Sequence, residues 1–173
     1  MRRVLCVIDY QVDFVTGSMG SPAADAIAPA LEARIREYLS GGDVVCFTRD
    51  MHTSPDYEES CEGKHIPVKH CMSGTPGCEI DPRIAPLSEG CRVFDKTGFG
   101  SFELGDYLRD LNPESIELAG VATNICVLSN AVIARTAVPG ARVFVDRNCV
   151  ATYDEALGRA ALDVLASVCV DVI

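Results

Sequence analysis

Three side chains with complementary chemistry lie at the ends of apolar runs of the sequence. Asp9 ends the first run, Lys96 follows the third, and Cys126 follows the fourth. A thiol is mostly protonated near neutral pH, so a nucleophilic cysteine needs a base, a cation or a helix N-terminus close to it. Asp9 can take the proton, Lys96 can stabilise the thiolate, and a helix that starts near Cys126 favours an anion. These residues predict an activated cysteine; the alternative is a core cysteine with two solvated charges.

A second group of reactive side chains lies in the long segment 49–82. This segment holds all three histidines of the sequence, His52, His65 and His70, together with acids that include Asp50. Connections in compact domains are usually about 4 to 6 residues long, and much longer ones are commonly functional. Imidazole and carboxylate ligands together suit zinc, iron or manganese. The segment predicts a metal site; the alternative is a hydrated acidic loop whose histidines bond to the backbone.

The elements that must position these residues alternate between strand and helix. Helical spacing is expected over residues 22–39, 104–111, 124–137 and 154–165. Six short apolar runs have the length of buried strands: RVLCVI, DVVCFT, CRVFD, SIELAG, ARVFVD and CVDVI. The alternation predicts an α/β fold, a doubly wound, mostly parallel six-stranded sheet with helices on both faces. The length fits one domain over residues 1–173.

The sheet explains how distant residues meet. Ligands of open parallel sheets bind outside the carboxyl ends of the strands. Asp9, Asp50, Lys96 and Cys126 each follow a different predicted strand. We therefore expect all four to converge on one edge of the sheet.

Composition narrows the class of partner and the compartment. The chain has 15 basic and 25 acidic residues, a formal charge of −10, which argues against nucleic acid and against an anionic membrane surface. No apolar run has the length of about 20 residues that spans a bilayer, and the start lacks a signal-peptide pattern. The nine cysteines are odd in number and contain no CxxC pair, which favours reduced thiols. We expect a cytosolic protein that acts on a small molecule.

Five segments, in this order, give the sequence a family resemblance: IDYQVDF, TRDMH, HCMSGTPG, DKTGFGSF and GVATNICV. Together they resemble the isochorismatase-like cysteine hydrolases over nearly the whole chain, and the long loop is most similar to that of nicotinamidases. The resemblance implies a catalytic triad of Asp9, Lys96 and Cys126. It also implies a cis peptide bond between Val121 and Ala122, with the backbone N–H groups of Ala122 and Cys126 as the oxyanion hole.

The same resemblance implies a metal site with Asp50, His52 and His70 as ligands. Its fourth ligand is either Glu58, six residues after His52, or Glu62, which stands in the context EGKHIPVKH. We favour Glu62 because the surrounding residues match better. The metal is expected to be one divalent transition ion, zinc first, with iron or manganese as alternatives.

The resemblance also implies a substrate. Phe14 and Phe99 are expected as apolar walls of the pocket, and Ile66 stands where the family has an aromatic residue. The leading expectation is a metal-containing amidase, a homo-oligomer, that hydrolyses nicotinamide to nicotinate and ammonia through a cysteine thioester. The alternatives are a relative that cleaves another small amide or carbamoyl compound, and a non-catalytic metal or redox protein.

Overall fold

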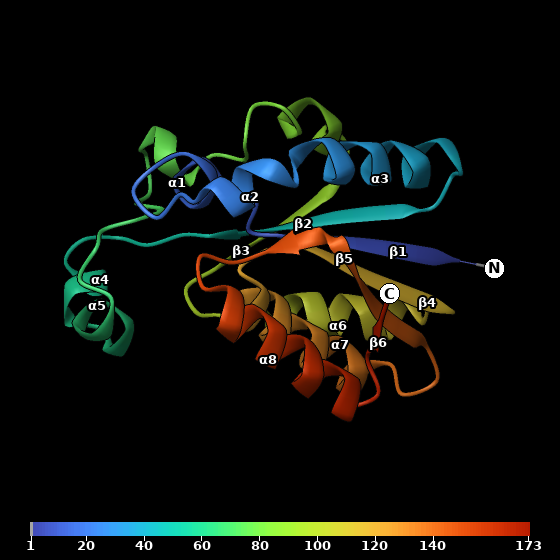
Figure 1. The fold of residues 1–173 in the computed structure, drawn as a ribbon. Coiled ribbons are helices and arrows are strands. Elements are labelled where there is room, and N and C mark those ends of the chain that lie inside the picture. Colours follow the sequence, from blue (N-terminus) through green and yellow to red (C-terminus); the bar gives the residue numbers. More distant parts are fainter. Residues whose placement is uncertain (1) are drawn as a thin grey trace.

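Residues 2–173 of the chain are described by a computed structural model, and they form one six-stranded sheet (Figure 1). Every neighbouring strand pair is parallel, and the order is β3-β2-β1-β4-β5-β6. The predicted doubly wound α/β fold is thus confirmed, with a sheet that is wholly parallel. The strands are β1 Arg3–Ile8, β2 Val44–Asp50, β3 Arg92–Lys96, β4 Ser115–Val121, β5 Arg142–Ala151 and β6 Asp171–Val172.

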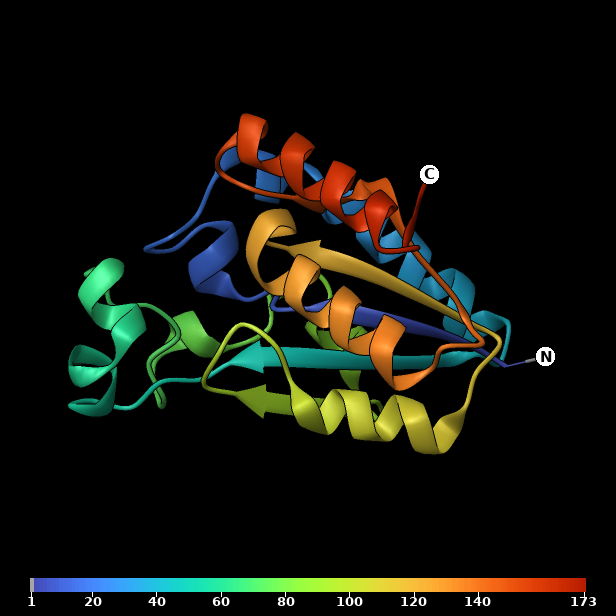
Figure 2. The same cartoon turned by 90° about the horizontal axis from the view of Figure 1, so that it is seen from below.

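Helices cover both faces of the sheet, as Figures 1 and 2 show. One face carries α1 Val12–Val15, α2 Pro22–Ala26 and α3 Ala28–Ser40, and the other carries α6 Phe102–Leu111, α7 Leu128–Ala137 and α8 Glu155–Ser167. The central strands β1 and β4 are buried on both sides, which explains why they read as continuous apolar runs. None of the helices in residues 2–173 is long and apolar enough to cross a bilayer.

The predicted helix over 22–39 is interrupted in the structure. Helix α2 ends at Ala26 and α3 begins at Ala28, with Ile27 between them. Pro29 lacks the N–H group that would bond to the carbonyl of Asp25, so one continuous helix would leave that carbonyl without its partner. Ser21 caps the N-terminus of α2, because its hydroxyl accepts a hydrogen bond from the Ala24 N–H.

The carboxyl ends of β1 and β4 lie side by side, where the strand order reverses. Gly120 of β4 has a φ of 117°, and a Cβ there would lie 2.1 Å from the carbonyl oxygen of Ile8. Only glycine permits this approach. The next strand, β5, extends five residues beyond the predicted run, and its register against β4 shifts between Leu118 and Gly120. The reversal of strand order, the position at which open parallel sheets bind ligands, therefore lies beside Asp9.

The long segment after β2 is not wholly irregular. It contains the short helices α4 Asp56–Glu59 and α5 Cys61–His65 and a 3-10 turn, η1 Pro76–Cys78, and a second 3-10 turn, η2 Ala85–Ser88, precedes β3. Helices α4 and α5 project beyond the carboxyl end of the sheet (Figure 1). All nine cysteines are free. Cys169 is exposed at the turn that follows α8.

Candidate active site

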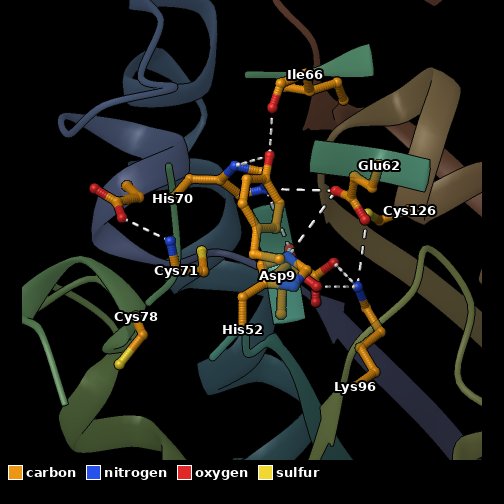
Figure 3. Close-up of polar contacts among 12 residues, drawn as sticks. Asp9, His52, Glu62, Ile66, His70, Cys71, Cys78, Lys96 and Cys126 are labelled. Atoms are coloured by element: carbon orange, nitrogen blue, oxygen red, sulfur yellow. Dashed lines mark hydrogen bonds and ion pairs between the residues drawn. The ribbon is translucent and has the colours of Figure 1, made fainter. Parts of the chain in front are cut away.

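Asp9, Lys96 and Cys126 meet at the carboxyl edge of the sheet (Figure 3). Lys96 Nζ lies 2.7 Å from Asp9 Oδ2 and 3.7 Å from Cys126 Sγ. All three residues are at most 6% exposed. Asp9 has a φ of 46°, a left-handed conformation that is uncommon for residues other than glycine and clusters at functional sites. The Thr48 hydroxyl donates to Asp9 Oδ1 at 2.6 Å and fixes the carboxylate.

Burial determines the protonation of this group. It raises the pKa of the Cys126 thiol, and the charge of Asp9 raises it further while Lys96 opposes. Burial also raises the pKa of Asp9 against the opposing charge of Lys96. Burial alone would lower the pKa of Lys96, but the charge of Asp9, followed by Cys126 and Asp50, raises it. Burial therefore favours the neutral thiol, and the 2.7 Å contact joins Lys96 to Asp9 beside it. Activation of Cys126, which the sequence predicts, would therefore have to act against burial.

The local conformation around Cys126 also differs from the expected helix. Thr123–Val127 form a π-helical turn, η3, and α7 begins only at Leu128. The N–H groups of Ile125 and Val127 both donate to the carbonyl of Ala122. The peptide bond between Val121 and Ala122 is cis. Such turns are frequent at functional sites, and here the turn directs the thiol toward Lys96.

A buried asparagine that the sequence did not single out supports the nucleophile. Asn130 Nδ2 donates to the carbonyls of Cys126 at 2.8 Å and Phe99 at 3.0 Å, and its Oδ1 accepts from the Ser101 N–H at 2.9 Å. Asn130 is fully buried and lies four residues after Cys126. A polar residue on the buried face of an apolar helix was the signal that could have identified it.

Asp50, His52, Glu62 and His70 form a second cluster, which we call the acid–imidazole cluster. Each offers one ligand atom, and the four atoms lie within 4.8 Å of one another. Asp50 Oδ2 is 2.8 Å from His52 Nε2 and 3.4 Å from His70 Nε2, and Glu62 Oε1 is 3.5 Å from His70 Nε2. Two imidazoles and two carboxylates, mostly buried, are a donor set that fits a divalent transition metal.

The electrostatics of the cluster also fit a cation. Burial raises the pKa of Asp50, but hydrogen bonds from His52 and His70 outweigh it and hold that pKa below the usual range. Burial lowers the pKa of His70, but hydrogen bonds to Asp50 and Glu62 raise it to about 10. The carboxylates of the cluster therefore favour a positive charge beside them, which a bound divalent metal would supply.

The two residues that sequence reasoning left open or set aside lie elsewhere. Glu58 is exposed and forms an ion pair with Lys69. His65 is exposed on α5, with its Nδ1 2.8 Å from the carbonyl of Cys61. The structure brings Glu62, and not Glu58, to the acid–imidazole cluster.

Two further polar residues of the motif IDYQVDF hold the long loop in place. The side chain of Gln11 accepts from the Asp50 N–H at 2.7 Å and donates to the carbonyls of Asp50 and Cys78, each at 2.8 Å. Asp13 Oδ2 accepts from the N–H of Cys71 at 2.7 Å, directly after His70. Sequence reasoning assigned neither residue a role, although their position within the motif was a signal.

One pocket joins the two clusters. Lys96 Nζ lies 3.5 Å from Asp50 Oδ1, so the ion pair of the triad touches the acid–imidazole cluster. Phe14, Ile66 and Phe99 line this pocket. The other lining residues are Met19, Ser21, Ala24, Asp50, Glu62, His70, Val121, Ala122, Ile125, Cys126, Thr152 and Tyr153. The site is thus a largely apolar hollow with a thiol and a candidate metal site on its wall.

A buried thiol, amine and carboxylate thus meet at the switch point of a doubly wound sheet, an arrangement that suits nucleophilic catalysis. Residues 3–173 match the isochorismatase domain family, and the chain belongs to that family. It is a hydrolase of the isochorismatase superfamily and resembles nicotinamidases.

Individual relatives agree with this assignment. The nicotinamidase/pyrazinamidase of Mycobacterium tuberculosis is 27% identical, with 99% of this chain and 98% of that protein covered. Streptothricin hydrolase of Streptomyces noursei is 31% identical over 88% of this chain and 55% of its own length. The crystal structure of the pyrazinamidase of Pyrococcus horikoshii in complex with zinc superposes with a TM-score of 0.85 at 25% identity, covering 100% of this chain and 99% of that one.

Proposed function

We propose that the protein is a metal-dependent amidase that hydrolyses nicotinamide to nicotinate and ammonia. The observation that carries this proposal is the shared pocket, whose wall contains Cys126 together with Asp50, Glu62 and His70. A substrate in this pocket reaches a nucleophile and a candidate metal at once. The similarity to the pyrazinamidase that was crystallised with zinc supports the same reading.

The first half of the reaction forms a thioester. Asp9 accepts the thiol proton of Cys126 as the sulfur attacks the carboxamide carbon, because burial keeps the thiol neutral until that moment. Lys96, 3.7 Å from Cys126 Sγ, stabilises the charge that develops on the sulfur. The backbone N–H groups of Ala122 and Cys126 are proposed to hold the oxyanion. Asp9 then gives its proton to the leaving nitrogen, and ammonia departs.

The second half of the reaction releases the acid. Asp9, again a carboxylate, takes a proton from water, and the resulting hydroxide attacks the thioester carbon. The carbon–sulfur bond breaks, and the proton held by Asp9 returns to the sulfur of Cys126. The sum is one amide and one water converted to one carboxylic acid and one ammonia.

Asp50, His52, Glu62 and His70 would hold the metal, for which zinc is proposed ahead of iron or manganese. When bound, the metal supplies a Lewis-acidic partner for the ring nitrogen of a pyridine carboxamide and so orients the substrate. Phe14, whose ring centroid lies 5.2 Å from that of His70, places an apolar wall beside this position.

A second candidate substrate class stays open within the same chemistry. Streptothricin hydrolase is as similar in sequence as the nicotinamidase, although this chain spans only 55% of it. Ile66 supplies an aliphatic wall to the pocket, so a substrate without a pyridine ring also fits its apolar character. In that case the triad cleaves a different small amide or a carbamoyl compound.

Ammonia release from nicotinamide, pyrazinamide, benzamide and N-carbamoyl compounds tests the proposal. We expect rapid turnover of nicotinamide and slow turnover of benzamide, which has the same shape but lacks the ring nitrogen. Cleavage of carbamoyl compounds with inert nicotinamide would replace the leading proposal by the second candidate.

A further inference from the structure

Tyr57 of α4 lies against both histidines of the acid–imidazole cluster. Its ring centroid is 4.7 Å from that of His52 and 5.3 Å from that of His70. The residue is 3% exposed, so its ring fills the space behind the two imidazoles. Sequence reasoning gave Tyr57 no role, and none of the chemical steps proposed above uses it.

The hydroxyl of Tyr57 helps to fix the orientation of His70. Its oxygen lies 3.3 Å from His70 Nδ1, and the same nitrogen lies 2.9 Å from the carbonyl of Val68. These two oxygens hold the Nδ1 proton, so Nε2 is the atom that faces Asp50 and Glu62. A ligating histidine whose second nitrogen is fixed in this way presents its free nitrogen in one orientation.

The same hydroxyl also reaches the wall of the substrate pocket. It donates to the carbonyl of Ile66 at 2.5 Å. The backbone of Tyr57 supports the turn that carries Glu62: its carbonyl accepts from the Ser60 hydroxyl at 2.6 Å. A Cβ at Gly63 would lie 2.0 Å from that carbonyl, so α5 packs directly on Tyr57.

We propose that Tyr57 is a positioning residue that couples the metal site to the pocket wall. Its hydroxyl holds His70 with Nε2 toward the other ligands and holds the backbone of Ile66, so one side chain sets metal affinity and the shape of the hollow. This inference rests on the proposed metal-dependent function, but it concerns metal binding, which can be measured without any substrate.

The variant Tyr57→Phe keeps the ring and removes only the hydroxyl. We expect its zinc affinity, measured by competition with a chromophoric chelator, to fall about 10- to 100-fold, as for other residues that orient a metal ligand. With zinc in excess, kcat should recover while the KM for nicotinamide stays raised, because the Ile66 carbonyl is still released. Tyr107→Phe is the matched control, since Tyr107 lies on α6 and does not line the pocket.

Two results would overturn the inference. The first is wild-type zinc affinity in a folded Tyr57→Phe protein. The second applies if the Tyr57→Phe protein does not fold, and it compares two other variants at position 57. p-Aminophenylalanine keeps a donor for the Ile66 carbonyl, whereas Tyr57→Leu removes it. We expect the p-aminophenylalanine protein to bind zinc well above the affinity of the Tyr57→Leu protein. Equal affinities of these two proteins would show that the polar group has no positioning role. Zinc binding that depends on Tyr57 in an enzyme inert toward nicotinamide would overturn only the proposed substrate.

Discussion

The triad and the acid–imidazole cluster touch each other but are built in different ways. Each member of the triad is the end of a strand or the turn after one: Asp9 follows β1, Lys96 ends β3, and Cys126 lies in the turn after β4. The sheet alone brings them together. The cluster takes Asp50 and His52 from the end of β2 and the residue pair Glu62 and His70 from the long loop.

This difference shows which part of the site depends on the loop. The Thr48 hydroxyl, itself on β2, and the side chain of Asn130 tie the triad to the packed interior. The cluster depends instead on Gln11, Asp13 and Tyr57, whose hydrogen bonds hold the long loop in place. Damage to the loop should therefore remove the metal and leave the triad in place, and changes to the sulfur should not affect the metal.

The largest expected effect separates chemistry from metal binding. Cys126→Ala should lower kcat for amide hydrolysis at least about 1,000-fold, because no other group can form the thioester. It should keep one metal per chain, measured by elemental analysis, since Cys126 is not part of the acid–imidazole cluster.

The reverse experiment changes the other region. His52→Ala should lose both metal and activity, whereas Cys169→Ala, at an exposed position, should lose neither. Metal loss in Cys126→Ala would show that metal binding depends on the triad, and it would contradict the prediction that the two regions are independent.

The next effect concerns the two glutamates between which the sequence could not decide. Glu62→Gln should weaken zinc binding by about 100-fold, because it removes a charged ligand. Glu58→Gln should leave zinc affinity unchanged, since Glu58 is exposed and pairs with Lys69. Chelator competition on the two proteins gives the answer directly. A greater loss in Glu58→Gln would mean that the loop adopts another register when it binds metal.

The uncertainty over Glu58 and Glu62 has a physical origin. The triad was predictable because the apolar runs of β1, β3 and β4 end close to its members, and the rule for parallel sheets then places Asp9, Lys96 and Cys126 at one edge. A loop has no comparable periodicity. Which acid reaches His52 and His70 depends on the α4–α5 turn and on contacts such as Tyr57 to Ile66, which no local pattern encodes.

The fold shows the same division. The strand and helix order could be predicted from hydrophobic patterns, but the break at Ile27 and the π-helical turn before α7 could not be seen in them. The protonation of the Cys126 thiol could not be predicted from the sequence either. The sequence shows a lysine available to Cys126, but only the structure shows that Lys96 is paired with Asp9 and that burial raises the thiol pKa.

The smallest expected effect tests how the triad is held by the sheet. Thr48 donates to Asp9 Oδ1 at 2.6 Å, and this hydrogen bond lowers the pKa of Asp9 against the effect of burial. Asp9 must be a carboxylate to accept the thiol proton, so kcat/KM should rise with pH as Asp9 loses its proton. Thr48→Val removes the hydrogen bond, which raises the pKa and moves this acidic limb to higher pH. The shift should be about one pH unit, since a hydrogen bond to a charged group contributes roughly 1.5 kcal/mol.

The pH profile of kcat/KM at saturating zinc measures this shift. Thr136→Val is the matched control, because the Thr136 hydroxyl bonds to the carbonyl of Val132 on the exposed side of α7. Its profile should coincide with that of the wild type. If Thr48→Val lowers kcat/KM equally at every pH, Thr48 places Asp9 without tuning its proton affinity. A shift toward lower pH would contradict Asp9 as the base, because the loss of a donor cannot lower the pKa of a carboxylate that it was stabilising.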